Sequence, residues 1–377
     1  MLRSRTVSLA ITRCGGMLAP VTFFPEHPQP LEPYAIAPWA EESLPLGTPS
    51  LLATLRGDWF CSAFGENGEP LAGRPIPPHG ETANGPWTRV GCGKTKEGAW
   101  LKLGIELPLQ GGHCVSTTAL LEDHSVIYQR HDLSRLTGPC NPGHHATLSF
   151  PDRLAAGSLS FSRLVAARTF LEPMERPETG GYSSLKPDVE IENLQAVPCV
   201  DGSTTDLTRF PARRGSEDIA ILCADPTLEF AWSSVVFADE GYVWFSLRNP
   251  RQLACTLLWF SNGGRHSPPW NGRHVNVMGI EDITGFFHVG IAASCRENAL
   301  SRRGIRTTLI PDGHGQLSIP YIQGVARIPP GFDRVLNIEG GASSDRINVR
   351  AESGRTVTIE CQVDFLRTGR LPGLEDL

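Results

Sequence analysis

Short β-favouring segments, separated by glycine and proline turns, are the feature that most constrains how this chain can fold. They are rich in β-branched and aromatic residues, which suit strands. The clearest are residues 99–109, 114–122, 125–133, 218–224, 242–248, 253–261, 334–340, 346–351 and 355–366. In the last of them, every second residue from Val357 to Phe365 is apolar, so these side chains share one face of a strand. With 39 glycines and 31 prolines among such segments, the sequence predicts an all-β fold, a sandwich or a barrel.

The N-terminus continues this pattern and does not have the pattern of a targeting segment. Val7, Leu9 and Ile11 alternate with polar residues, which predicts a half-buried strand, and a second strand is expected after Gly15 and Gly16. Polar residues interrupt the apolar stretch that a signal peptide needs. No segment reaches the roughly 18 apolar residues of a membrane span. We therefore expect a soluble, cytoplasmic protein without membrane partners.

Composition narrows the class of partner. The net charge of −6 is modest and dispersed, which argues against nucleic acid. Ten cysteines occur without any C-x-x-C pair, which favours reduced thiols over a zinc site or a disulfide framework. At 377 residues with no internal repeat, we expect one domain over residues 1–377.

Helical signals are few. Ser294 followed by Glu297 has the spacing of a capping box, and Gly304 can end a helix. We therefore expect one short helix from about residue 294 to 304. Residues 172–217, rich in proline, glycine and charge, are expected to form long connections.

Three stretches carry groups able to perform acid–base chemistry. His79 begins "HGETANGPW", which has the composition of a tight turn, His144 and His145 stand where a turn enters a strand, and Glu281 follows the apolar segment 275–280. Each also has an ordinary interpretation, because a turn histidine is often only hydrogen-bonded and a glutamate after a strand is often solvated. The histidine pair has no third ligand at a recognisable spacing, so we expect no metal site.

Taken in order, the three stretches resemble the aldose 1-epimerase (galactose mutarotase-like) family. The nearest pattern is that of its hexose-6-phosphate epimerase branch, H-G-F-A-R-N-x-P-W, where this chain has H-G-E-T-A-N-G-P-W. "WFCSAFGENGEP" and "MGIEDITGFF" resemble the segments around the family's turn and its catalytic glutamate. The similarity in order spans roughly residues 5–366.

This resemblance implies a large antiparallel β-supersandwich with few short helices and a concave sugar-binding face. It implies interconversion of sugar anomers without metal or cofactor, with Glu281 as the general base and His145 as the general acid. His79 would bind or polarise the sugar. The expected substrate-binding set comprises His144, Asp218, Arg265, Trp270 and His274, together with Trp87 at the end of the turn.

Departures from the family pattern leave alternatives open. Ala146 and Thr147 follow the histidines where the family has an aromatic pair, so His144 remains an alternative to His145 as the acid. Asp282 and Glu81 are the next candidates for the base. Trp39 is either a sugar-stacking platform or a core residue.

The turn also bears on the charge of the ligand. Ala83 replaces the arginine of the phosphohexose branch and Glu81 replaces an aromatic residue, although Arg74 and Arg89 lie nearby. We therefore expect a small neutral carbohydrate as partner, not a phosphorylated one. Two other functions stay open, a carbohydrate-binding protein without turnover, and a lyase or hydrolase. A hydrolase normally needs two opposed carboxylates, and only Glu281 is well placed in the sequence.

Overall fold

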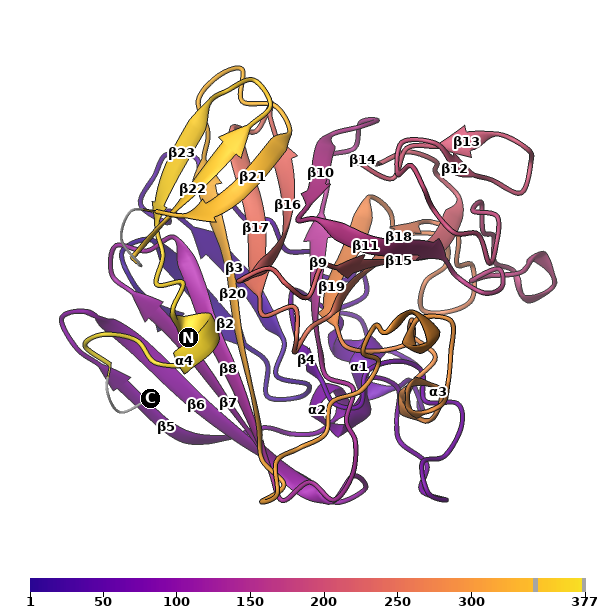
Figure 1. Ribbon diagram of the computed structural model, residues 1–377, viewed down its shortest axis with the longest axis horizontal. Helices are drawn as coiled ribbons and strands as arrows, with labels where there is room; N and C mark the ends of the chain where they lie inside the picture. Colours follow the sequence, from indigo (N-terminus) through magenta and orange to yellow (C-terminus); the bar gives the residue numbers. More distant parts are fainter. Residues whose placement is uncertain (342–344, 375–377) are drawn as a thin grey trace.

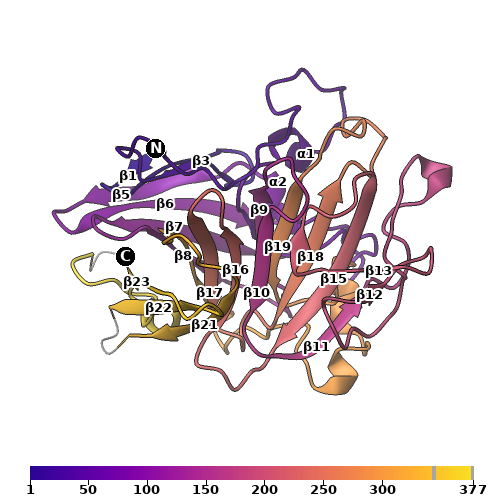
Figure 2. The same ribbon diagram turned by 90° about the horizontal axis from the view of Figure 1, so that it is seen from above.

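Two large antiparallel sheets form the body of the protein (Figures 1 and 2). The computed structural model describes residues 1–341 and 345–374 of the chain. One sheet has nine strands and the other has six, and they pack on each other through a shared apolar core. The predicted all-β class and the large antiparallel sandwich are thereby confirmed.

The sheets are made of strands from distant parts of the chain. The nine-stranded sheet has the order β14 (Arg209–Phe210), β10 (Gly157–Phe161), β16 (Ala231–Phe237), β17 (Tyr242–Arg248), β20 (Leu317–Arg327), β8 (Val126–Ser134), β7 (Gly112–Leu121), β6 (Gly98–Leu107) and β5 (Thr88–Lys94). The six-stranded sheet has the order β11 (Leu164–Thr169), β15 (Ser216–Ala224), β18 (Cys255–Asn262), β19 (Val277–Ile283), β9 (Gly143–Ser149) and β4 (Phe60–Cys61).

Smaller elements complete the fold. Short sheets are formed by β1 (Leu2–Arg3), β2 (Val7–Ile11) and β3 (Leu18–Phe23), by β12 (Val197–Pro198) and β13 (Thr204–Thr205), and by β21 (Val335–Gly340), β22 (Arg346–Ala351) and β23 (Thr356–Glu360). The described helices are α1 (Ser50–Thr54), α2 (Gly80–Asn84), α3 (Ile291–Cys295) and α4 (Phe365–Thr368), with 3-10 turns η1 (Pro177–Thr179) and η2 (Ser301–Arg303). Each described helix is too short to cross a membrane.

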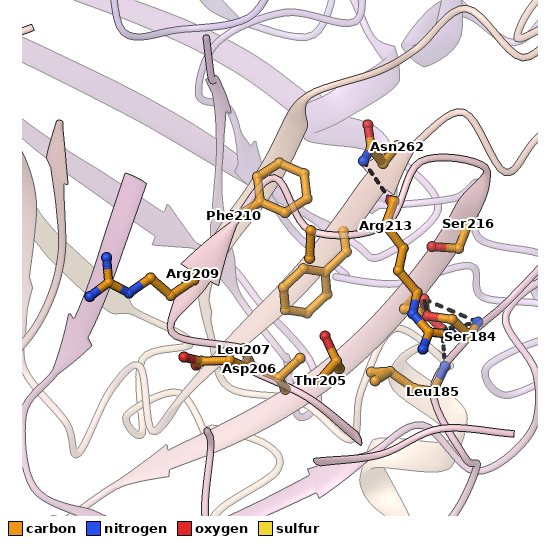
Figure 3. A pocket seen from close by; sticks show the side chains of 13 residues that line it. Ser184, Leu185, Thr205, Asp206, Leu207, Arg209, Phe210, Arg213, Ser216 and Asn262 are labelled. Carbon is orange, nitrogen blue, oxygen red and sulfur yellow. Dashed lines mark hydrogen bonds between the residues drawn. The ribbon is translucent and has the colours of Figure 1, made fainter. Parts of the chain in front are cut away.

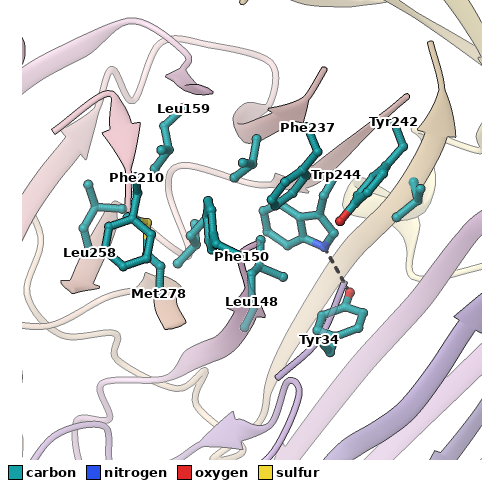
Figure 4. Close-up of a cluster of buried hydrophobic side chains, with 14 of the residues drawn as sticks. Tyr34, Leu148, Phe150, Leu159, Phe210, Phe237, Tyr242, Trp244, Leu258 and Met278 are labelled. Atoms are coloured by element: carbon teal, nitrogen blue, oxygen red, sulfur yellow. Dashed lines mark hydrogen bonds between the residues drawn. The ribbon is translucent and has the colours of Figure 1, made fainter. Parts of the chain in front are cut away.

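Alternation along the strands decides which residues face the core between the two sheets. Leu148, Leu258 and Met278 project from the six-stranded sheet into that core, where they meet aromatic side chains of the other sheet such as Phe237 and Trp244 (Figure 4). Their neighbours in sequence project to the opposite face, because successive strand residues point to opposite sides. That opposite face carries a second apolar cluster, which α1 and residues 286–300 help to cover.

The predicted strands are found at their expected places, with one exception at the C-terminus. The segment expected to continue to residue 366 ends as β23 at Glu360, and Phe365 instead begins α4. Cys361 and Phe365 are still buried, Phe365 against Tyr128. The prediction of a long strand was wrong because a turn followed by a helix buries these side chains equally well.

The predicted helix was also wrong in extent. α3 ends at Cys295, and Ser294 lies inside it rather than at its start. The Ser294 hydroxyl donates to the Gly290 carbonyl oxygen at 2.8 Å and accepts from the Phe286 N–H at 3.0 Å, so it is not available as a cap. Gly304 does adopt a left-handed conformation (φ 76°), but it ends the turn η2. Residues 172–217 form connections with only short elements, as expected, up to Ser216, where the nine-residue strand β15 begins.

Candidate functional site

A cavity of about 420 Å³ lies on the face of the six-stranded sheet that points away from the core between the sheets. Strands β9, β15, β18 and β19 supply its floor, and α1, the start of α2 and the loops around residues 66, 174, 265 and 288 supply its walls. The lining residues are Pro49, Leu51, Leu52, Leu55, Trp59, Glu66, Gly68, Pro78, His79, His145, Met174, Ile219, Trp259, Arg265, Trp270, Glu281 and His288.

A carboxyl–imidazole pair lies in this cavity. His145 on β9 is directly opposite Glu281 on β19, and its Nε2 atom lies 3.3 Å from Oε1 of Glu281. Both side chains are buried. The sequence indicated that Glu281 follows the apolar strand. β19 instead extends to residue 283, so Glu281 lies within it.

Burial has opposite effects on the pKa values of the two groups. It raises the pKa of Glu281 well above the usual value and lowers the pKa of His145 well below it, and nearby His79 lowers the latter further. Both directions favour an uncharged carboxyl beside an uncharged imidazole. The pair can therefore hold one proton and move it between two atoms 3.3 Å apart.

Two neighbours hold the His145 ring in place. Trp59 stacks on it, with ring centroids 3.9 Å apart and planes within 21°. The Thr147 hydroxyl lies 3.3 Å from Nδ1, on the same face of β9 because it is two residues further along. A hydroxyl can donate or accept, so Thr147 supports the ring whichever nitrogen carries the proton.

His79 stands at the start of α2, which occupies the segment that the sequence suggested to be a tight turn. His79 and Gly80 both have positive φ, 58° and 77°. A Cβ atom at Gly80 would lie 1.8 Å from the Ser62 carbonyl oxygen, so only glycine fits after the histidine. This backbone places the ring centroids of His79 and His145 5.2 Å apart.

The tautomer of His79 follows from its neighbour Cys61. The Cys61 sulfur lies 3.6 Å from Nδ1 of His79. Burial raises the pKa of the thiol well above its usual value, so it stays protonated and donates to Nδ1. Burial, with a contribution from His288, lowers the pKa of His79 to about 3. His79 is therefore neutral, and with the thiol as donor to Nδ1 its own proton lies on Nε2.

A second carboxylate–histidine pair lies in the cavity. Nε2 of His288 is 3.3 Å from Oε1 of Glu66, whose side chain is 63% exposed. The hydrogen bond from His288 lowers the pKa of Glu66, so this carboxylate is ionised near neutral pH. The cavity thus holds an uncharged pair in its interior and a solvated charge elsewhere in its lining.

Arg265 is the cation of the cavity lining, and it is already paired. Its guanidinium forms an ion pair with Glu175 and lies 4.8 Å from the ring centre of Trp270. Trp259, which also lines the cavity, donates to Glu217 at 2.9 Å. Burial raises the pKa of Glu217 to about 7. Arg265 and Trp270, both expected at the site, do line the cavity.

The structure does not bring two of the expected binding residues to the cavity, because they project to the other face of their strands. His144 points into the core between the sheets, with Nδ1 3.0 Å from Oδ2 of Asp58. Asp218 accepts hydrogen bonds from the backbone of Ser184 and Leu185 and lines a separate small pocket. Figure 3 shows this pocket, with Ser184 and Leu185 among its labelled residues. The next residue along each strand, His145 and Ile219, does line the cavity, because successive strand residues point to opposite faces.

Trp87 and His274 also lie outside the cavity. Trp87 is buried and donates from Nε1 to the Thr82 carbonyl oxygen at 2.8 Å, which closes the turn after α2. His274 stacks on Trp259 with ring centroids 5.5 Å apart, one layer behind the wall. Trp39 is fully buried, so it is a core residue rather than a stacking platform.

The turn residues considered for ligand charge do not line the cavity. Glu81 accepts hydrogen bonds from the backbone N–H groups of Leu109 and Gln110. Arg74 lines a different pocket, and Arg273, in the loop after Arg265, pairs with Glu42. Glu81 is thus no base candidate, and Asp282 faces the core between the sheets, where it pairs with Arg248.

Sequence reasoning missed several lining residues. Trp59 and Glu66 lie in the segment "WFCSAFGENGEP", whose resemblance to the family gave neither of them a role. Trp259 and His288 have no motif that separates them from ordinary strand and loop residues. Trp259 had one available signal, since it shares a strand face with Leu257 and Ser261. That signal alone does not say which face holds a site.

Comparisons with known proteins bear on the fold. No protein-family model matches the chain, and no curated protein sequence matches it significantly. A galactose mutarotase related enzyme from Lactobacillus acidophilus is 10% identical, with a TM-score of 0.54 over 87% of this chain and 98% of its own. A candidate aldose 1-epimerase from Escherichia coli K12 is 12% identical, with a TM-score of 0.56 over 87% of this chain and 98% of its own. A galactose mutarotase-like protein from Lactobacillus casei is 7% identical, with a TM-score of 0.54 over 86% of this chain and 99% of its own. This chain has the galactose mutarotase-like β-sandwich fold.

Proposed function

We propose that this protein is an isomerase that interconverts the α and β anomers of a free aldose by general acid–base catalysis. The pairing of Glu281 with His145 across 3.3 Å in a cavity of about 420 Å³ carries the proposal. The fold supports it, because similar structures include proteins described as a galactose mutarotase related enzyme and a candidate aldose 1-epimerase. The ten unpaired cysteines suit work in a reducing compartment, the cytoplasm.

The chemistry needs one proton removed from the anomeric hydroxyl and one delivered to the ring oxygen. At rest the shared proton lies on the Glu281 carboxyl, and its transfer to Nε2 of His145 creates a carboxylate and an imidazolium. The carboxylate then takes the anomeric proton while the imidazolium protonates the ring oxygen, and the C1–O5 bond breaks. After rotation about C1–C2, the reverse steps close the ring on the other face. The pair ends with the single proton with which it began.

The other polar groups of the cavity would position the sugar. His79 offers Nε2–H to a sugar oxygen from the start of α2. The flat rings of Trp59 and Trp259 suit the C–H face of a pyranose, and Arg265 and Trp270 complete the binding set. Glu175 neutralises Arg265 while Glu66 stays ionised, so a neutral sugar fits better than a phosphorylated one.

A specific observation favours a second candidate function, glycoside hydrolysis. The structure adds Glu66 to Glu281 as a carboxyl group in the same cavity, and hydrolases use two such groups. Release of new reducing ends from a glycoside panel would identify this activity, and its absence alongside anomer exchange would exclude it.

Exchange spectroscopy by NMR on a panel of free aldoses tests the proposal. We expect anomer exchange above the spontaneous rate for at least one neutral aldose, and loss of that excess in Glu281→Gln. Glu178→Gln, an exposed glutamate outside the cavity, is the matched control and should keep the parent rate. Exchange at the spontaneous rate for the whole panel would contradict the proposal, and binding without exchange would identify a carbohydrate-binding protein instead.

A further inference from the structure

One wall of the cavity is apolar and does not suit the hydroxyl groups of an unsubstituted sugar. Pro49, Leu51, Leu52 and Leu55, from the segment that contains α1, line it. We call these four residues the apolar wall. They are not simply the underside of the core, since Pro49 and Leu52 keep accessible surface while they line the cavity.

The apolar wall offers few hydrogen-bond partners, even from its backbone. The Leu52 carbonyl oxygen accepts from Nε1 of Trp39 at 2.7 Å, and the Leu55 carbonyl oxygen accepts from the Ala37 N–H at 3.0 Å. The Leu51 N–H donates to the Asn84 side chain at 3.4 Å. A sugar hydroxyl pressed against this wall would lose its bonds to water without replacement, which is unfavourable.

The shape of the wall separates it from the tryptophans of the cavity. An indole ring is flat and can stack on the C–H face of a sugar ring, as Trp59 and Trp259 can here. Branched aliphatic side chains and proline present no such plane, and they gain most from burying methylene and methyl groups. At about 420 Å³, the cavity lies within the range that holds drug-sized ligands.

We infer that the substrate is an aldose carrying a short apolar substituent, an alkyl or acyl group on a hydroxyl other than the anomeric one. The substituent packs on the apolar wall while the anomeric carbon lies at Glu281 and His145. The reacting end of this assignment rests on the proposed function. The preference for the substituent is a property of binding and can be measured without turnover.

Calorimetric titration with a matched series of glucose derivatives tests the inference. The probes are glucose, its 3-O-butyl and 6-O-butyl ethers, and the corresponding 2-methoxyethyl ethers, whose chains have equal length but contain an oxygen. We expect one butyl ether to bind at least tenfold more tightly than glucose and than its methoxyethyl counterpart. Butyl ethers that bind no more tightly than glucose, or methoxyethyl ethers that equal them, would overturn the inference.

A substitution places the preference on the wall. In Leu52→Asn, the ratio of the glucose dissociation constant to that of the preferred butyl ether should fall at least fivefold. Leu154→Asn, at a leucine that is 77% exposed and outside the cavity, should keep the parent ratio. An unchanged ratio in Leu52→Asn would contradict the assignment to this wall.

The two proposals fail in different ways. If a butyl ether binds tightly but no sugar shows accelerated anomer exchange, the assignment of the apolar wall stands and the isomerase proposal fails. If exchange of glucose is accelerated and the butyl ethers gain nothing, only the inference about the substituent fails.

Discussion

Replacing Glu281 and Asp282 one at a time by their amides should have opposite consequences, although the two carboxyl groups are adjacent in sequence. Glu281 faces the cavity and His145, whereas Asp282 faces the core between the sheets. Glu281→Gln should lower the rate of anomer exchange about 100-fold and leave stability intact, whereas Asp282→Asn should keep the rate and lower stability. Both changes keep side-chain size, so they differ mainly in the proton and charge that they remove.

The cost of Asp282→Asn follows from its surroundings. Its carboxylate lies 2.9 Å from Nη1 of Arg248 and accepts from the hydroxyls of Ser246 at 2.6 Å and Thr256 at 2.7 Å. Both charged side chains are at most 1% exposed, so the amide leaves a buried guanidinium without its counter-charge, at about 3–5 kcal/mol. With an unfolding entropy of about 2.1 cal/mol/K per residue over 377 residues, the melting temperature should fall by about 4–6 °C.

Glu281→Gln should behave differently, because burial already favours the uncharged form of that carboxyl group. The amide keeps the shape of the protonated acid, so we expect a melting temperature within about 2 °C of the parent. It cannot take the anomeric proton, and general-base contributions of this kind amount to about 100-fold in rate, or about 2.7 kcal/mol.

Thermal unfolding and NMR anomer exchange on the same two variants decide the matter. The reasoning fails if Asp282→Asn unfolds at the parent temperature, or if Glu281→Gln exchanges sugar at the parent rate. An inactive but fully stable Asp282→Asn would move the base by one residue and invert the assignment of strand faces.

Further predictions follow the same geometry. His145→Asn should lower the rate of anomer exchange about 100-fold with little change in stability. His144→Asn should keep the parent rate, measured where the variant is folded, and should unfold at a lower temperature. The reverse result would contradict the assigned faces of β9. Thr147→Val removes the hydroxyl 3.3 Å from Nδ1 of His145, so exchange should fall about three- to tenfold, the effect of a typical hydrogen bond, and an unchanged rate would show that Thr147 does not orient the ring. Burial, with a contribution from Arg265, lowers the pKa of His274 to about 3 from 6.5, so the unfolded chain binds the extra proton and stability falls as pH drops below 6.5. Denaturant titrations should show that His274→Gln removes about 2 kcal/mol of this loss between pH 6.5 and 5, and identical pH profiles for the two proteins would refute it. Glucose should bind at least tenfold more tightly than glucose 6-phosphate, about 1.4 kcal/mol, and tighter binding of the phosphate in the same titration would overturn the neutral-sugar proposal.

Local patterns in the sequence determine most of the sheet content of this protein. Strands such as β17 and β22 have the bounds that their residues predict, because β-branched and aromatic side chains between glycine and proline turns favour extended backbone wherever they pack. For the same reason, His79, His145 and Glu281 could be singled out from the sequence, since each lies at a recognisable turn or strand.

Only the tertiary structure decided which of two neighbouring residues faces the cavity. Choosing His145 over His144, or placing Asp218 away from the cavity while Ile219 lines it, depends on which face of the six-stranded sheet packs on the other sheet. That choice is made by long-range contacts, and a shift of one residue along a strand reverses it. The apolar wall depends in the same way on packing between distant segments, because the residues around α1 line one cavity with β9 and β19 only in the folded chain.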